Sequence, residues 1–244
     1  MSTGSASPQS DGTGTPRRIL VWDAPVRVFH WLLVLCFVGA WLTAESERWR
    51  LAHVTLGYTM AGLVAFRLVW GLVGTRHARF ASFVRRPAAV LRYLRSILSS
   101  HAEHHTGHNP AGAVAIVLLL LLTLLTTVSG WAAYNEIAAR YAGEWHEGLA
   151  NTMLMLVVVH IAGVVAGSLL HRENLVAAML TGRKSGAARD AIRRPWRAVA
   201  VLLIAGVVGF WIYQWRAAPT PAGGNAQLSA STPSTAPASA ASAP

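Results

Sequence analysis

A chain of 244 residues with 53% hydrophobic and only 13% charged side chains has more apolar surface than one soluble core can bury, which indicates a membrane protein. Its formal charge of +11 could suggest a nucleic-acid partner, but the basic residues cluster beside long apolar segments, where membrane topology and anionic lipid account for them. We therefore expect contact with membrane lipid and no nucleic acid. The single cysteine, Cys36, excludes a disulfide framework and a cysteine-held metal cluster.

The N-terminal residues are rich in Ser, Gly, Thr and Pro and lack the apolar segment of a signal peptide. We expect residues 1–17 to form a disordered tail. Beyond the tail, five apolar segments approach the roughly 20 residues that an α-helix needs to cross a bilayer. These segments comprise residues 26–44, 53–73, 111–134, 146–170 and 198–215.

The five segments predict an all-α, integral membrane protein. Residues 18–185 hold the first four spans and are expected to form a four-helix bundle, which a basic linker at 186–197 joins to a fifth transmembrane helix at 198–216. Arginines are abundant between the second and third spans and after the fourth, whereas Glu leads the charges of the other two loops. The positive-inside rule then places the N-terminus in the cytoplasm and the C-terminus outside. The Ala-, Pro- and Ser-rich residues 217–244 are expected to form a disordered outer tail.

The basic loop between the second and third spans contains two further patterns. Over residues 87–100, Leu and Ala recur at helical spacing with Arg off that face, which favours a short helix on the membrane surface or an ordinary loop helix. The motif SHAEHHTGH follows, and it could bind a surface metal ion or form a plain polar loop. Its histidines are His101, His104, His105 and His108.

Four other histidines lie in the spans or at their ends, where an ionisable side chain is costly and is a functional candidate. His146 and His160 are fourteen residues apart in the fourth span, which is about 21 Å of helical rise and roughly 40° short of four whole turns. Both imidazoles therefore lie on one face at two depths. The up-and-down topology places His53 at the outer depth beside His146, and His30 at the inner depth beside His160. His171, farther along the same face, is an alternative inner partner that lies closer to the headgroups.

Two neutral imidazoles on opposite sides of an iron porphyrin, in a dry apolar pocket, are the ligands of a low-spin haem. The paired histidines therefore predict two haems about 20 Å apart, close enough for electron tunnelling. With a single cysteine there is no CxxCH motif, so each haem would be bound without a covalent link. A histidine at a helix end is, taken singly, more often an interfacial residue than a ligand, so the prediction depends on the joint pattern.

Arg67 lies fourteen residues after His53 and so falls on nearly the same face of the second span, at the inner depth. A guanidinium within a span needs an anion, and a propionate of the inner haem would satisfy it bidentately. The alternative is that Arg67 snorkels to the inner interface. Gly57 and Gly130 are small enough to let a porphyrin approach the backbone.

Six motifs occur in the order VWDAPVRVFHW, LAHVTLGY, FRLVWGLVGTRHARFASF, GHNPAG, HEGLAN and SLLHRENLVAAMLTGRK. Together they resemble the bacterial cytochrome b561 and nickel-hydrogenase b-type cytochrome family over residues 18–185. The resemblance implies a four-helix cytochrome of the bacterial inner membrane that holds two b haems and exchanges electrons with quinone. The residues that match its axial ligands and its helix-two arginine are His30, His53, His146, His160 and Arg67.

The fifth helix and the C-terminal tail depart from that four-helix pattern and leave the redox partner open. We expect a periplasmic protein, such as a cytochrome c or a hydrogenase, at the outer haem and quinone at the inner haem. No catalytic residue is predicted, and activity as a quinone oxidoreductase stays open.

Two other classes of protein stay open as well. A transporter or metal permease could relay ions along the same four histidines, but such sites usually need Asp or Glu in the spans, where we expect none. A membrane anchor without haem, in which the histidines are incidental, is the other alternative.

Overall fold

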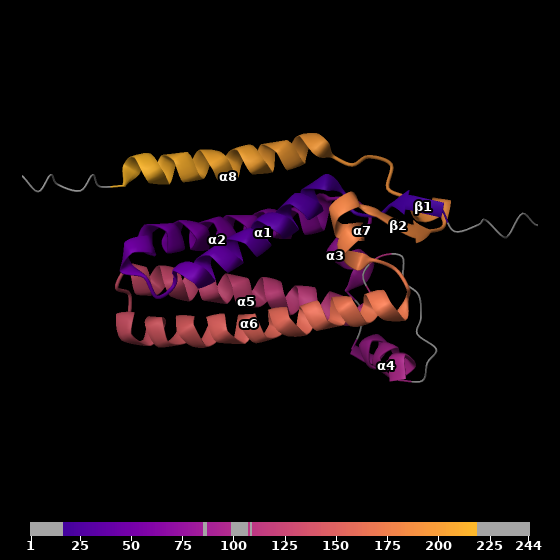
Figure 1. The fold of residues 1–244 in the computed structure, drawn as a ribbon, viewed down its shortest axis with the longest axis horizontal. Helices are drawn as coiled ribbons and strands as arrows, with labels where there is room; N and C mark the ends of the chain where they lie inside the picture. The colour runs from indigo at the N-terminus through magenta and orange to yellow at the C-terminus, as the bar shows by residue number, and fades with distance from the viewer. Residues whose placement is uncertain (1–16, 85–86, 99–106, 108, 219–244) are drawn as a thin grey trace, which may run out of the picture.

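Five long helices run side by side along the molecule (Figure 1). The computed structural model describes residues 17–84, 87–98, 107 and 109–218, and in that part of the chain five helices are long and apolar enough to cross a membrane. The expected all-α membrane fold with a fifth span is confirmed. The five helices are α1 (Ala24–Thr43), α2 (Arg50–Val73), α5 (Pro110–Tyr134), α6 (Ala139–Leu170) and α8 (Arg197–Ala217).

Side-chain caps set where two of these helices begin. The carboxylate of Asp23 accepts a hydrogen bond from the backbone N–H of Val26 at 2.8 Å, and proline occupies the first turn of α1. Asn109 does the same for α5, accepting from the N–H of Gly112 at 2.7 Å, again with proline in the first turn. Proline has no N–H to leave unsatisfied there, so an Asx cap followed by proline is a strong helix start.

Shorter elements gather at one end of the bundle, which we call the basic end (Figure 1). They are the strands β1 (Arg17–Leu20) and β2 (Arg183–Gly186) and the helices α3 (Phe80–Phe83) and α7 (Leu175–Thr181). The opposite end, which we call the hairpin end, carries η1 (Glu47–Trp49) between α1 and α2 and the turn between α5 and α6. The two strands pair antiparallel. The remaining elements are α4 (Pro87–Leu98) and η2 (Ala188–Asp190).

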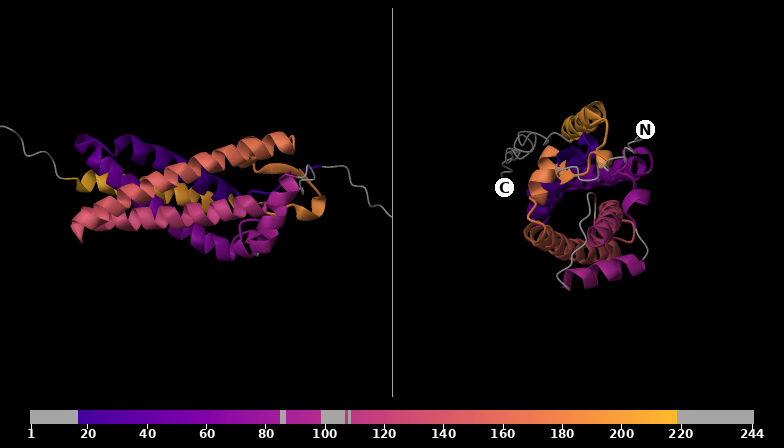
Figure 2. Two further views of the ribbon diagram at one scale, coloured as in Figure 1. Left: turned by 90° about the horizontal axis from the view of Figure 1, so that it is seen from below. Right: turned by 90° about the vertical axis from the view of Figure 1, so that its right-hand side faces the viewer.

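The helices pack as two pairs with α8 outside them. α5 lies along α6 and α1 along α2, and contacts between α2 and α5 join the pairs. α8 lies against α1 and α2, on the side away from α5 and α6 (Figures 1 and 2). Many large apolar side chains of these helices are exposed, as on a surface that faces lipid. The main buried core consists of Phe29, Cys36, Met60, Leu63, Val64, Leu120 and Met153.

Three residues at the expected domain boundaries lie in regular structure instead. Arg17, which we placed in the N-terminal tail, pairs in the β-ladder with Gly186, which we placed in the linker. The ladder forms because the apolar residues after Arg17 have a core to enter, and Ile19 is only 6% exposed. Ala217, which we placed in the outer tail, still belongs to α8 because alanine continues a helix readily.

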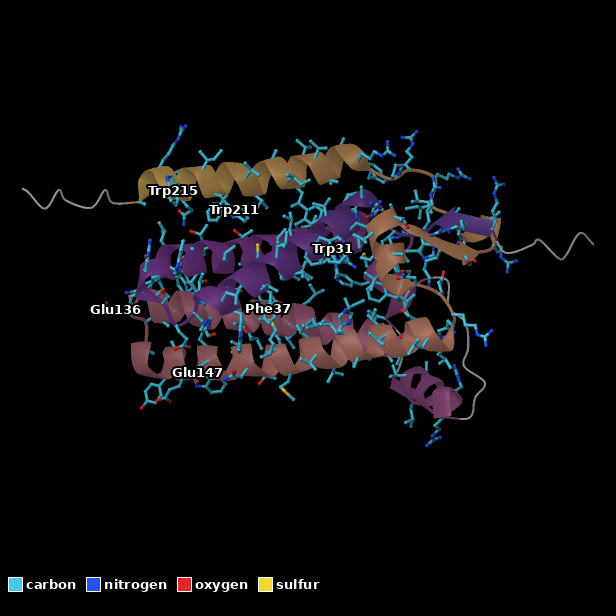
Figure 3. All side chains as sticks on the ribbon, viewed as in Figure 1. Trp31, Phe37, Glu136, Glu147, Trp211 and Trp215 are labelled. Atoms are coloured by element: carbon cyan, nitrogen blue, oxygen red, sulfur yellow. The ribbon has the colours of Figure 1, made fainter. Side chains whose placement is uncertain are left out.

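The fourth span also begins earlier than expected, since α6 starts at Ala139. The expected range 146–170 already contained Glu147, and the candidate span also includes Glu144, so the expectation of spans without acidic residues was wrong. Both residues are exposed in the first turns of α6, and Figure 3 shows Glu147 toward the hairpin end. They lie at the margin of the bundle and not along its interior.

Candidate haem sites

His53 and His146, which we call the outer pair, face each other near the hairpin end. His53 lies in the first turns of α2 and His146 in the first half of α6. Their ring centroids are 6.0 Å apart, with the ring planes at 82°. Two imidazoles that share one metal ion, each at a bond length of about 2 Å, have centroids roughly 6 Å apart. The two rings therefore have the spacing that one shared iron requires.

Backbone carbonyl groups orient both rings of the outer pair. His53 Nδ1 lies 2.9 Å from the carbonyl oxygen of Ala40 on α1, and His146 Nδ1 lies 2.9 Å from that of Thr126 on α5. Because a carbonyl oxygen only accepts, each Nδ1 must carry the proton and donate it. In the neutral form of each ring, Nε2 is then the nitrogen without a proton, which is the atom that can bind iron. Helices α1 and α5 thus fix the tautomer of imidazoles that α2 and α6 carry.

The two glycines singled out in the sequence have different surroundings. A Cβ added at Gly130 would lie 2.8 Å from both Cε1 and Nδ1 of His146, so this glycine makes room for the imidazole. Gly57, one turn after His53, has no atom within 4 Å of the position of an added Cβ. The surface at Gly57 therefore offers the open space that a flat macrocycle needs beside the outer pair.

His30 on α1 and His160 on α6, which we call the inner pair, lie closer to the basic end. The two imidazoles are near enough for their charges to interact. His30 Nδ1 is buried without a hydrogen-bond partner among the described residues, and the ring of Trp31 meets that of His30 at 89°, with centroids 5.1 Å apart. A buried nitrogen without a partner costs about 1–3 kcal/mol. The inner pair thus lacks the carbonyl support of the outer pair and leaves one nitrogen to be satisfied by another group.

Arg67 is only 2% exposed, so its side chain is buried within the protein. Its Nη1 donates a hydrogen bond to the carbonyl oxygen of Ala78 at 2.9 Å, and its guanidinium carbon lies 4.9 Å from the centroid of the Phe80 ring. The carboxylate of Asp23 is close enough to interact with its charge. The bond to Ala78 uses one of five N–H donors, so the guanidinium retains capacity for a second anion.

These features together fit non-covalent haem. The outer pair supplies two imidazoles whose Nδ1 atoms are engaged and whose Nε2 atoms are available to a metal, and open space lies beside them at Gly57. The inner pair supplies two more imidazoles at a second depth, with Arg67 buried on the neighbouring α2. Each pair offers two imidazoles, and two nitrogen donors suit a macrocycle with two axial ligands better than a bare metal ion.

The model of the family described as prokaryotic cytochrome b561 matches residues 21–182, a range that contains both histidine pairs. The chain belongs to the prokaryotic cytochrome b561 family. It is therefore a membrane b-type cytochrome that uses haem in electron transport. The fifth helix, α8, lies beyond the matched residues.

Curated relatives resemble this cytochrome over most of their own length. A probable Ni/Fe-hydrogenase B-type cytochrome subunit of Bradyrhizobium diazoefficiens is 24% identical over 211 residues, which cover 68% of this chain and 85% of the relative. A protein of the same description from Azotobacter vinelandii is 27% identical over 211 residues, or 67% of this chain and 87% of the relative. The probable Ni/Fe-hydrogenase 1 B-type cytochrome subunit of Escherichia coli K12 is 24% identical over 213 residues, which cover 68% of this chain and 90% of the relative. No solved structure matches the chain significantly.

Asp23 is a site residue of the cytochrome that our reading of the sequence missed. It is 1% exposed, and besides capping α1 its Oδ2 accepts hydrogen bonds from Thr75 Oγ1 at 2.6 Å and from Trp70 Nε1 at 3.1 Å. The carboxylate thereby ties the start of α1 to the end of α2, next to Arg67. An acidic residue immediately before Ala-Pro at the start of an apolar segment is a helix-cap signal that could have identified it.

Two other histidines of the cytochrome, His77 and His171, have different surroundings from those of the two pairs. His77 Nε2 lies 2.8 Å from the carbonyl oxygen of Asp190, so it donates to the linker between α7 and α8. His171 follows the last residue of α6 as its C-cap, while His160 lies inside the helix and near His30. The structure therefore favours His160 over His171 in the inner pair. His101, His104, His105 and His108 of the SHAEHHTGH motif lie outside the described residues.

Proposed function

We propose that this cytochrome carries electrons across the membrane on two b haems, between a periplasmic redox protein and the quinone pool. The observation that supports it most strongly is the outer pair. Its rings lie 6.0 Å apart, and each Nδ1 is engaged by a carbonyl of a neighbouring helix. Imidazoles prepared in this way have one free nitrogen each and little freedom to turn, as axial ligands require.

The proposed axial ligands are His53 with His146 for the outer haem and His30 with His160 for the inner haem. A haem with two imidazole ligands supplies one-electron redox chemistry. Along α6, His146 and His160 are fourteen residues apart, which corresponds to about 21 Å of rise and so to two depths in the membrane. Carbonyl groups of α1 and α5 fix the rings of the outer pair, and the apolar side chains of the bundle exclude water from both pairs.

Arg67 is the proposed partner of a propionate of the inner haem. Its burial and its unused donors support this role. Asp23 neutralises part of its charge when the propionate is absent, and it holds the end of α2 that carries the arginine. A buried charge that loses its partner is strongly destabilising, so both anions contribute to keeping Arg67 inside the bundle.

We place the basic end of the molecule in the cytoplasm of a bacterium and the hairpin end in its periplasm, because arginines concentrate at the basic end. The N-terminus is then cytoplasmic and the C-terminus periplasmic, across the inner membrane. The relatives are described as subunits of Ni/Fe hydrogenases, which favours a hydrogenase over a cytochrome c as the periplasmic partner. Quinone is proposed to bind at the basic end, near the inner haem.

Electron conduction across a bilayer tests the proposal. The full-length protein is reconstituted in liposomes that contain ferricyanide, and dithionite, which does not cross the bilayer, is added outside. We expect the ferricyanide to be reduced in proportion to the protein content, and we expect His53→Ala and His160→Ala each to stop the reaction. His171→Gln, which changes a histidine outside both pairs, should leave the rate unchanged. Equal rates with and without the protein would contradict the proposal, and membranes without haem would favour a permease.

A further inference from the structure

A pocket of about 490 Å³ lies at the basic end, apart from both histidine pairs. It is formed by the residues just after α2 and by the segment of the linker that leads into α8. Three arginines and one tryptophan line it, and none of the described residues in its wall is acidic. These side chains are Arg76, Arg193, Arg194 and Trp196.

The wall of this pocket is held in place by backbone hydrogen bonds. The N–H of Ile192 donates to the carbonyl oxygen of Leu20 in β1 at 2.9 Å, and the N–H of Ala24 donates to the carbonyl oxygen of Pro195 at 2.9 Å. The linker is therefore fixed to the start of the bundle at both ends of the arginine-bearing segment. A pocket fixed in this way exists before any ligand arrives, which lowers the entropic cost of binding.

The protein balances only one of the three positive charges in the pocket with an ion pair in the described residues. Arg76 pairs with the carboxylate of Asp190 at 3.4 Å. Arg193 and Arg194 make no hydrogen bond or ion pair with the described residues. Arg193 and Arg194 both line the pocket, and guanidinium groups present planar sets of N–H donors that match the oxygens of a phosphate group. The pocket thus has the charge and the donor geometry for a phosphate-bearing anion.

The position of the pocket at the membrane surface favours an anion that also carries acyl chains. It lies where α2 ends and α8 begins, and the ends of transmembrane helices lie at the level of the lipid headgroups. Trp196 is 47% exposed at this level, and its ring packs at 78° against that of Trp70, 5.7 Å away. On the last turn of α2, Leu72 and Val73 are 73% and 71% exposed. An anion in the pocket therefore has apolar helix surface next to it, on which acyl chains can lie.

We propose that this pocket binds the phosphodiester headgroup of an anionic phospholipid, with Arg193 and Arg194 on the phosphate and the acyl chains along the end of α2. The bound lipid joins the linker and α8 to the end of α2, where Arg67 and Trp70 are buried. This site is independent of the haem ligands, so its test does not depend on the proposed function.

The test measures lipid binding to the full-length protein in a nonionic detergent. Phosphatidylglycerol, phosphatidylcholine and inorganic phosphate are each titrated while thermal unfolding is followed, and native mass spectrometry counts the retained lipid. We compare the natural chain with an Arg193→Gln, Arg194→Gln double variant. The matched control, Arg48→Gln with Arg216→Gln, removes the same charge from the hairpin end.

We expect phosphatidylglycerol to raise the unfolding temperature and phosphatidylcholine to have no effect. Affinity for phosphatidylglycerol should fall about 30-fold in the pocket variant, because each basic residue near a lipid surface contributes roughly 5-fold. In native mass spectrometry, the natural chain should retain one lipid more than the variant. The control should bind as the natural chain does. An equal loss in the control, equal stabilisation by inorganic phosphate, or no response to phosphatidylglycerol would each overturn the proposal.

Discussion

Gly130 on α5 lies directly against the imidazole of His146 on α6, so that an added Cβ would be 2.8 Å from two ring atoms. One turn earlier on α5, the carbonyl oxygen of Thr126 accepts the hydrogen bond from His146 Nδ1 at 2.9 Å. The outer pair therefore depends on a helix that carries no ligand of its own. α5 positions the ring by leaving space on one side and providing an acceptor on the other.

Gly130→Val should remove the outer haem and leave the inner one. The branched side chain occupies the volume of the His146 ring, and the imidazole must turn away from Thr126 and from His53. We expect the haem content of the purified protein to fall by about half, as measured by pyridine haemochrome absorbance. Gly209→Ala on α8, where no atom lies within 4 Å of the added Cβ, is the control and should keep the full content. Unchanged haem in Gly130→Val would refute the role given to α5.

Arg67→Met should lower the midpoint potential of one haem. Removing a nearby positive charge favours the oxidised, more positive form of the iron, and a tenfold change in a one-electron equilibrium corresponds to about 59 mV. We expect a downward shift of roughly that size or more in one of two components of a redox titration. Arg50→Met, which removes a side chain that is 61% exposed in an ion pair at the hairpin end, should shift neither component. If neither midpoint potential shifts in Arg67→Met, Arg67 does not lie beside a haem.

Asp23→Ala should be among the most destabilising single changes in the chain. It removes the cap of α1 and the acceptor of Thr75 and Trp70, and it leaves the buried Arg67 without a neighbouring carboxylate. Each buried donor left without its acceptor costs about 1–3 kcal/mol, and the lost helix cap costs about 1 kcal/mol more. Thermal unfolding in detergent measures the loss, and Asp23→Asn, which keeps an acceptor oxygen, should lose less. Glu47→Gln, in an exposed pair 3.8 Å from Arg50, should change stability by no more than about 1 kcal/mol.

α8 should be fixed to the bundle in part by one hydrogen bond, from Trp211 Nε1 to Thr59 Oγ1 at 2.9 Å. Trp211 faces α2 from the outer helix (Figure 3). A double-mutant cycle of Trp211→Phe and Thr59→Val should give a coupling energy of about 1 kcal/mol in thermal unfolding. Trp215→Phe, at a residue that is 80% exposed, should not couple to Thr59→Val. The haem content should stay unchanged throughout, since neither residue touches a histidine of either pair. Additive effects of the two changes would show that this bond does not hold α8.

The spans and the outer pair followed from the sequence because both depend on simple periodicity. Apolar length sets a membrane helix, and two residues fourteen apart must share a face. That arithmetic placed His53 opposite His146 without any knowledge of packing. The same arithmetic put Arg67 toward the inner end of α2 but did not reveal what surrounds it.

The contacts that position these residues could not be read in the same way. Asp23 contacts Trp70 and Thr75, which lie about fifty residues later in the chain, and no local pattern encodes such a pairing. The contact between Gly130 and His146 could not be predicted, because sequence shows that a residue is small but not which neighbour needs the space. The β-ladder between β1 and β2 was missed because four-residue strands joined across most of the chain leave little periodic signal.

We propose that four histidines hold two haems, and the number of haems per chain tests this most directly. Pyridine haemochrome analysis of the purified full-length protein should give two b haems per chain. It should give one in each of the single variants His30→Ala, His53→Ala, His146→Ala and His160→Ala. A natural chain with one haem or none, or a histidine variant that keeps both, would contradict the account.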